Sequence, residues 1–261
     1  MPDTDALIAS LHASHDRLAG IVAGLDEKAV QGPSYADEWS IAQVASHLGS
    51  GAEIFGLLLE AGLSESAPPE GARFQAIWAV WDAREPAEQV AESVAANAAF
   101  LARVDGVPRA GRDGFLVQTF AGPTDLARLT TMRLGEHALH SWDIAVALDP
   151  AAQVAPDAVA LLIDDMLAGV AARAGKPEAQ PRTIVVETSE PARTFVLTTG
   201  PAVTLAPAPE SGSDVEADAR LSLPAEALVR LVYGRLDEAH TPDGIGGADL
   251  LPGLRAVFPG F

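Results

Sequence analysis

The sequence predicts an α+β protein in which a bundle of four principal helices precedes a smaller domain that contains a sheet. Two patterns indicate this class. Over most of the first 150 residues, apolar side chains recur at intervals of three and four, which is the period of amphipathic helices. Between residues 183 and 223, short β-branched segments alternate with turn residues, as is typical of strands. The composition changes near Pro150, so we expect a helical domain over residues 1–152 and an α+β domain over residues 153–261.

The principal helices of the first domain are separated by loops, as in helix bundles. They are predicted over residues 5–25, 40–62, 86–104 and 124–148, with a shorter helix over 74–84. Ser40 and Gln43 are three residues apart and fit a capping box, and Trp39 with Val44 fits the hydrophobic staple around it. Pro86 suits a first helical position, because proline has no N–H to leave unpaired there.

The second domain alternates between helical and strand patterns. A helix is predicted over residues 156–174 and another over residues 224–236. The strands are predicted at TIVVET (183–188), TFVLTT (194–199), VTLAPA (203–208) and EADARLSL (216–223). The glycine-containing stretches GGADLLPG and GPTDLAR read as turns, and no phosphate loop or dinucleotide fingerprint is present.

Charge and composition exclude several classes of function. The 17 Lys and Arg residues are outnumbered by 36 Asp and Glu residues, and the formal net charge is −19. Such a charge repels nucleic acids and anionic membranes, so we expect neither as a partner. No apolar run is long enough for a transmembrane helix and the N-terminus lacks a basic signal region, so we expect a cytoplasmic protein. There is no cysteine, so any thiol chemistry needs a thiol supplied by a cofactor.

A polar cluster interrupts the apolar stripe of the predicted helix over residues 124–148. Steps of three and four residues along this helix give Leu126, Leu129, Arg133, Glu136, His140, Asp143 and Ala147. The residues that flank the polar part of this stripe are apolar, namely Leu134, Leu139 and Ile144. A helix face in solvent would carry polar residues on its flanks as well, so we expect the cluster to face inward.

Three of the inward residues suit a metal ion. Glu136 and His140 are four residues apart on one helix face, and His47 lies on the apolar stripe of the second helix. Two histidines and a carboxylate with an open fourth position form a common catalytic zinc site, which also suits other divalent ions. Asp143 could orient one imidazole. The pair His137 and His140, three residues apart, is the rival ligand set, and spacing alone does not decide between them.

Each of these features also has an ordinary explanation. A histidine on an apolar stripe is usually a core residue with a hydrogen-bond partner, and a Glu–His pair is usually exposed on a helix surface. Their combination within a predicted bundle favours a metal site. Arg235 follows a glycine at a helix end, where an arginine commonly complements the helix C-terminus. Either Arg235 or Arg133 could instead hold a substrate carboxylate through its planar guanidinium group.

Two segments resemble a known family. EWSIAQVASHL (38–48) and RLGEHALHSWDIAVAL (133–148) are similar to the signature helices of the mycothiol-dependent maleylpyruvate isomerases, a branch of the DinB-like metal-binding four-helix bundles. The segments LSLPAEALVRLVYGRL and LLPGLRAVFPGF near the end of the sequence resemble the C-terminal domain of that family, which is sterol-carrier-like. The resemblance spans nearly the whole chain and implies a DinB-like bundle followed by a small α+β sterol-carrier-like domain.

The resemblance implies a divalent metal, typically zinc, held by His47, Glu136 and His140, and thus favours Glu136 over His137. It also implies mycothiol, the actinobacterial low-molecular-weight thiol, as co-substrate, and Arg235 as a catalytic residue. We therefore expect an isomerase or S-transferase whose thiolate attacks a small electrophilic substrate, acting as a monomer or homodimer. The alternative is a non-catalytic, metal-containing protein that binds a small molecule or lipid.

Overall fold

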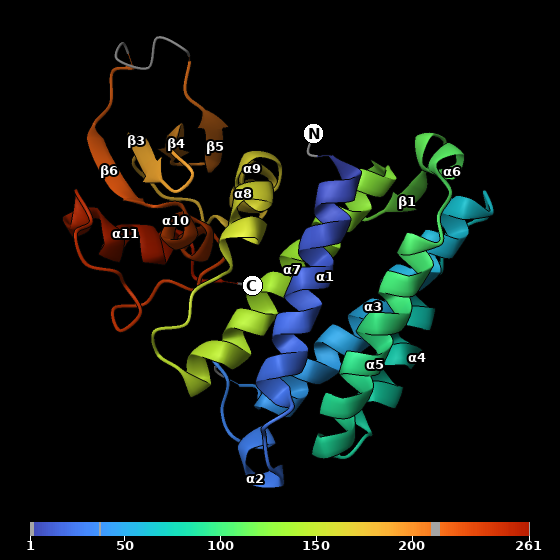
Figure 1. The fold of residues 1–261 in the computed structure, drawn as a ribbon. Coiled ribbons are helices and arrows are strands. Elements are labelled where there is room, and N and C mark those ends of the chain that lie inside the picture. The colour runs from blue at the N-terminus through green and yellow to red at the C-terminus, as the bar shows by residue number, and fades with distance from the viewer. Residues whose placement is uncertain (1–2, 37, 210–214, 261) are drawn as a thin grey trace. The chain divides into compact units, whose positions relative to one another are not determined.

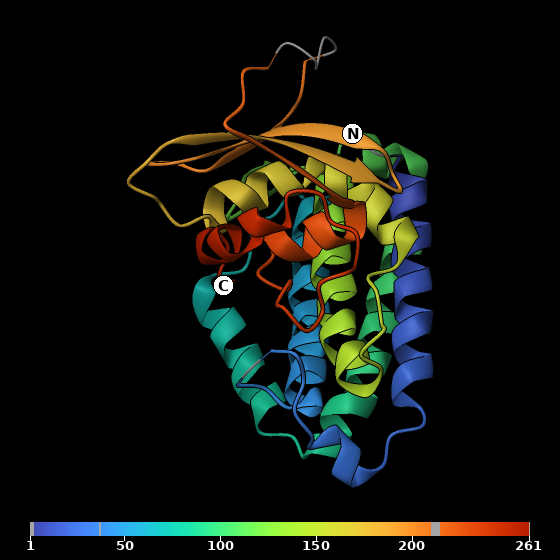
Figure 2. The ribbon, with the colours of Figure 1, turned by 90° about the vertical axis from the view of Figure 1, so that its left-hand side faces the viewer.

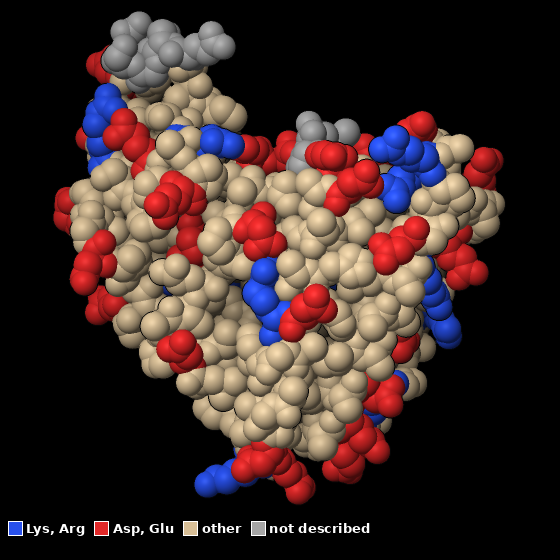
Figure 3. Space-filling view, in the orientation of Figure 1, with Lys and Arg blue, Asp and Glu red and all other residues tan. Residues whose placement is uncertain are grey.

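The computed structural model describes residues 3–36, 38–209 and 215–260, and the chain divides into two compact units, residues 1–153 and residues 154–261 (Figure 1). The first unit is almost entirely helical, and the second combines helices with a small sheet. The predicted α+β class is confirmed. On the face drawn in Figure 3, acidic side chains are scattered among uncharged residues and outnumber the basic ones, in keeping with the net charge of −19.

Four long helices form the bundle of the first unit: α1 (Thr4–Val22), α3 (Ile41–Leu63), α5 (Pro86–Asp105) and α7 (Leu126–Leu148). Each packs against two others, so that α1 contacts α7 and α5, and α3 likewise contacts α7 and α5 (Figure 2). The shorter helices are α2 (Glu27–Val30), α4 (Gly71–Asp82) and α6 (Arg109–Asp113). Within the described residues, no helix combines the length and hydropathy that a membrane span requires.

The helix starts follow the local capping chemistry. The Ser40 hydroxyl accepts a hydrogen bond from the N–H of Gln43 (3.2 Å), and the Gln43 side chain accepts one from the N–H of Ser40 (2.9 Å), so the predicted capping box of α3 is confirmed. Pro86 occupies the first turn of α5. Helix α7 begins two residues later than predicted, because the Asp125 carboxylate caps the N–H of Arg128 (2.7 Å).

A glycine in α3 lets α4 pack closely against it. The indole of Trp81 in α4 is 1% exposed, and its N–H donates to the Glu53 carboxylate of α3 (2.9 Å). A Cβ atom on Gly49 would lie 2.1 Å from the Trp81 ring. The absence of a side chain at position 49 is therefore what makes room for the indole.

The second unit contains a four-stranded sheet in the order β5-β4-β3-β6, with helices packed on one of its faces (Figure 2). Its strands are β3 (Arg182–Ser189), β4 (Arg193–Thr199), β5 (Thr204–Pro207) and β6 (Ala219–Pro224). Strands β3, β4 and β5 pair antiparallel, whereas β6 runs parallel to β3. The helices are α8 (Pro156–Asp165), α9 (Leu167–Ala174), α10 (Ala225–Val232) and α11 (Leu251–Val257), preceded by the 3₁₀ turn η2 (Ala248–Leu250).

Several elements differ from the sequence-based expectation. The helix predicted over residues 156–174 is two helices separated at Met166. The helix predicted over residues 224–236 ends at Val232, because Gly234 adopts a φ of +71° that helical residues do not. Of the segments expected as turns, GGADLLPG contains η2 and the start of α11, and GPTDLAR contains the strand β2 (Gly122–Thr124) and the start of α7. Strand β2 pairs with β1 (Val117–Thr119) in a hairpin.

Candidate metal centre

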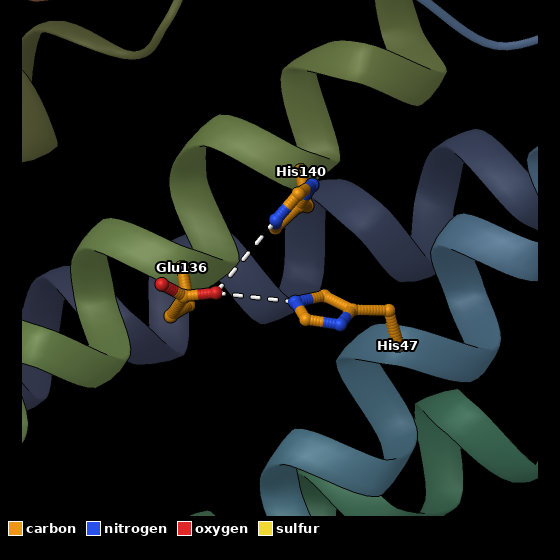
Figure 4. A group of neighbouring side chains, drawn as sticks. All are labelled: His47, Glu136 and His140. Atoms are coloured by element: carbon orange, nitrogen blue, oxygen red, sulfur yellow. Dashed lines mark hydrogen bonds and ion pairs between the residues drawn. The ribbon is translucent and has the colours of Figure 1, made fainter. Parts of the chain in front are cut away.

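The contact between α3 and α7 brings three predicted ligands together (Figure 4). His47 projects from α3, and Glu136 and His140 project from successive turns of α7 toward it. One potential ligand atom from each residue lies within 4.8 Å of the other two. Residues 89 positions apart in the sequence therefore form one cluster.

The distances in this cluster suit a small divalent ion. Nε2 of His47 lies 3.1 Å from Oε2 of Glu136, and Nε2 of His140 lies 3.7 Å from the same oxygen. Ligands bound at ordinary zinc distances in a tetrahedron are roughly 3.3–3.5 Å from one another. The two measured separations lie on either side of that range, and imidazole nitrogens with a carboxylate oxygen are a donor set that zinc and similar ions accept. The residues present thus fit such an ion.

Asp143 orients the imidazole of His140, as expected. Its carboxylate is fully buried and accepts a hydrogen bond from Nδ1 of His140 (2.8 Å). The Asp143 backbone carbonyl also accepts the N–H of Tyr35 (3.0 Å). A proton fixed on Nδ1 leaves the lone pair on Nε2 of His140, the nitrogen that faces Glu136.

The cluster is open to solvent on one side. The side chains of His47 and Glu136 are 32% and 44% exposed, and that of His140 is 15% exposed. Among the described residues, the group contains three donors and no fourth. A site with three protein ligands and solvent access has room for an exogenous ligand, whereas a purely structural site is closed by four protein ligands.

The surroundings keep Glu136 ionised. Burial acts to raise the pKa of Glu136, but the hydrogen bond with His47 and the charges of His140, His47 and Arg133 outweigh it and lower the pKa to about 2. Glu136 can therefore act as an anionic ligand throughout the physiological pH range.

An aromatic side chain that was not predicted as a site residue lies beside the cluster. The Trp39 ring stacks on His140 at 6.3 Å between ring centroids and lies 5.3 Å from the His47 ring. It is 38% exposed. The sequence suggests only a packing role for Trp39 beside the helix start. The position of His47 two turns farther along α3 is the signal that could have indicated its place at the site.

The structure separates the rival histidine from the cluster. His137 is fully buried and faces α1, where its Nδ1 is hydrogen-bonded to the Ser14 hydroxyl (2.8 Å). Burial lowers the pKa of His137 well below its usual value, and the Arg133 charge lowers it further. His137 is not among the residues that converge with His47.

The two arginines suggested as substrate anchors lie in different surroundings. Arg133 is 1% exposed, so it cannot meet a carboxylate that approaches through solvent, and the suggestion that it holds substrate is corrected. Burial lowers the pKa of Arg133 to about 10, although Glu136 acts to raise it. Arg235 belongs to the second unit, where its Nη1 donates to the Tyr233 carbonyl (3.0 Å). Its catalytic role stays a prediction.

Comparisons with known proteins match both halves of the chain. A family model described as the mycothiol maleylpyruvate isomerase N-terminal domain matches residues 11–145, and the model for the C-terminal domain of these isomerases matches residues 153–253. No curated protein shows a significant match. A crystal structure of the mycothiol-dependent maleylpyruvate isomerase aligns with a TM-score of 0.69 and 12% identity over 94% of this chain and 92% of the other. A histidine-to-alanine mutant of that isomerase aligns with a TM-score of 0.66 and 12% identity over 90% of each chain. At this identity, the structural likeness concerns the fold.

Proposed function

Because the chain belongs to the mycothiol maleylpyruvate isomerase family, we propose that it is a metal-dependent enzyme that uses mycothiol to isomerise or conjugate a small electrophilic substrate. The observation that carries this proposal is the convergence of His47, Glu136 and His140 at a position open to solvent. The lack of cysteine is compatible with it, because any thiol that reacts must then come from a co-substrate.

We assign the role of metal ligands to His47, Glu136 and His140. A divalent ion held there, typically zinc, would lower the pKa of a thiol bound at the open position and so favour the nucleophilic thiolate. Glu136 contributes the negative charge of the site, and Asp143 holds His140 in the tautomer that presents Nε2. Trp39 excludes water from one side of the ligands with its indole ring.

Arg235 is proposed to bind a carboxylate of the substrate. It lies in a loop whose backbone is held by two other arginines: Arg230 donates to the carbonyls of His240 (2.9 Å) and Arg235 (3.3 Å), and Arg255 donates to that of Leu236 (2.6 Å). A loop fixed in this way presents a side chain with little loss of entropy on binding. The planar guanidinium group of Arg235 suits bidentate recognition of a carboxylate.

The first test is the metal content of tag-free protein by elemental analysis. We expect nearly one equivalent of a divalent metal in the wild type and its loss in Glu136→Ala and in His47→Ala. The control is His12→Ala, which removes an imidazole of α1 whose Nε2 pairs instead with Asp105 (3.0 Å). Metal retained in Glu136→Ala, or absent from the wild type, would contradict the assignment.

A second test addresses the reaction. Metal-loaded protein, mycothiol and electrophiles that carry a carboxylate are mixed, and consumption of free thiol distinguishes conjugation from isomerisation, which regenerates it. We expect Arg235→Lys to raise KM for such substrates more than it lowers kcat, because lysine keeps the charge but loses the bidentate geometry. An unchanged KM would remove Arg235 from the substrate site while leaving the metal assignment intact.

A further inference from the structure

Arg133 is a buried cation whose hydrogen bonds go to neutral groups. Its Nη2 donates to the backbone carbonyl of Leu48 in α3 (2.7 Å) and to Oδ1 of Asn97 in α5. Its Nε has no hydrogen-bond partner in the described part of the chain. A buried arginine is normally paired with a carboxylate, because an uncompensated charge is expensive to remove from water. The charge of Glu136 offsets part of this cost, but no hydrogen bond joins its carboxylate to Arg133 in the described part of the chain, so the arrangement calls for a reason.

The surface of α3 is shaped to receive this guanidinium group. His47, Gly51 and Phe55 are spaced four residues apart and therefore lie along one face of α3. A Cβ atom on Gly51 would approach within 2.7 Å of Nη1 of Arg133, and the Phe55 ring lies 5.6 Å from its central carbon. The guanidinium group thus occupies a fitted space directly along α3 from His47.

These contacts connect Arg133 to the ligands through the backbone of both helices. The carbonyl that it binds belongs to Leu48, the residue after His47, and Arg133 itself precedes Glu136 by less than one turn of α7. The contact with Asn97 adds α5, and Asn97 is in turn held by its own bond to the Ser93 carbonyl (2.8 Å). A shift of α3 relative to α7 would have to break the bond to Leu48.

We propose that Arg133 is a positioning residue that fixes His47 relative to Glu136 and His140 and thereby sets the affinity and the coordination geometry of the metal site. This role rests on the proposed metal site. A positioning role and a purely electrostatic role predict opposite changes in metal affinity when Arg133 is replaced. The positive charge of Arg133 repels a divalent cation, so removal of the charge alone would tighten metal binding. Loss of positioning would weaken it.

The test is a titration of the metal-free full-length protein with Co²⁺, followed by the visible absorption of the bound ion. For Arg133→Met, which keeps an unbranched apolar stem and removes the charge, we expect binding about 10–100-fold weaker than wild type and an altered absorption spectrum. Arg133→Lys keeps the charge but lacks the planar guanidinium group that places Nη2 between the Leu48 carbonyl and Oδ1 of Asn97, and we expect it to bind more weakly than the wild type.

Arg103→Met is the matched control. Arg103 is an exposed arginine of α5 whose Nη1 would lie 3.1 Å from a Cβ atom on Gly56 of α3, so it also lies against a glycine of α3 but belongs to a helix that carries none of the proposed ligands. It should bind Co²⁺ as the wild type does. If Arg133→Met does not fold, as judged by circular dichroism, Asn97→Ala replaces it, since it removes one acceptor and keeps the arginine.

The outcomes are separable. Weaker binding with a changed spectrum in the Arg133 or Asn97 variant supports the positioning role. Unchanged or tighter binding with the wild-type spectrum overturns that role and leaves the proposed metal site intact. Failure of the wild type to bind Co²⁺ overturns the metal site, and the role of Arg133 falls with it.

Discussion

At the scale of single residues, the candidate centre depends on groups that touch no solvent. Asp143 is fully buried and its contact with His140 fixes which imidazole nitrogen carries the proton. Replacement by asparagine preserves the shape but allows either tautomer. We expect Asp143→Asn to weaken zinc binding about 10–100-fold, as measured by competition with a chelator. Binding equal to that of the wild type would show that His140 needs no such partner.

His137 gives the fold a dependence on pH. Its folded pKa lies well below the unfolded value because it is buried as the neutral imidazole. Above pH ~6.5 the group is neutral in both states and contributes nothing to pH dependence. Below it, the unfolded chain takes up a proton that the folded chain does not, so stability falls as the pH decreases.

The measurement is urea unfolding of metal-free protein between pH ~7.5 and ~5. We expect His137 to contribute a loss of about 1.4 kcal/mol per pH unit below its unfolded pKa. His137→Gln should lower stability at neutral pH and flatten this slope by that amount. Parallel pH profiles for variant and wild type would refute the assignment.

At the scale of elements, the packing of α4 on α3 depends on the bare backbone at Gly49. Alanine favours a helix over glycine by about 1 kcal/mol, but a Cβ atom at this position would collide with the Trp81 ring. We expect Gly49→Ala to destabilise the protein by about 1–3 kcal/mol in urea unfolding. Gly20→Ala in α1, where a Cβ atom meets nothing within 4 Å, should instead be stabilising. If both substitutions changed the free energy of unfolding similarly, α4 would be able to shift and make room for a Cβ atom at position 49.

The long helices and the ligand spacing could be predicted from the sequence because both follow the period of one helix. The apolar residues that surround His47 and Glu136 on their own helices predicted that both would lie on inward faces. The fate of Arg133 could not be predicted in this way, since its burial depends on the space that Gly51 leaves on another helix. The β1–β2 hairpin was missed because its strands have three residues each, too short for an alternating pattern.

At the scale of the whole molecule, metal binding should stabilise residues 1–153 and leave the stability of residues 154–261 unchanged. The three proposed ligands all lie in residues 1–153. A ligand at 100 times its Kd adds about 2.7 kcal/mol to the state that binds it. All four tryptophans, at positions 39, 78, 81 and 142, belong to the same unit, so their fluorescence reports its unfolding alone.

Removal of the metal with a chelator should therefore lower the unfolding midpoint seen by tryptophan fluorescence. Far-ultraviolet circular dichroism reports both units. The unfolding transition of residues 154–261 in that signal should keep its midpoint when the metal is removed. Glu136→Ala, treated in the same way, should show no change on chelation. A common shift of both signals would mean that the two units unfold together.

The placement of the ligands along the chain has a consequence for biosynthesis. His47 leaves the ribosome before Glu136 and His140, which lie on the last long helix of the bundle, 89 or more residues later. A nascent chain that lacks α7 holds only His47 of the three proposed ligands, which gives an ion little to bind at this site. On the proposed assignment, metal uptake would follow the completion of the bundle, and the ion would stabilise a finished unit without helping an unfinished one to fold.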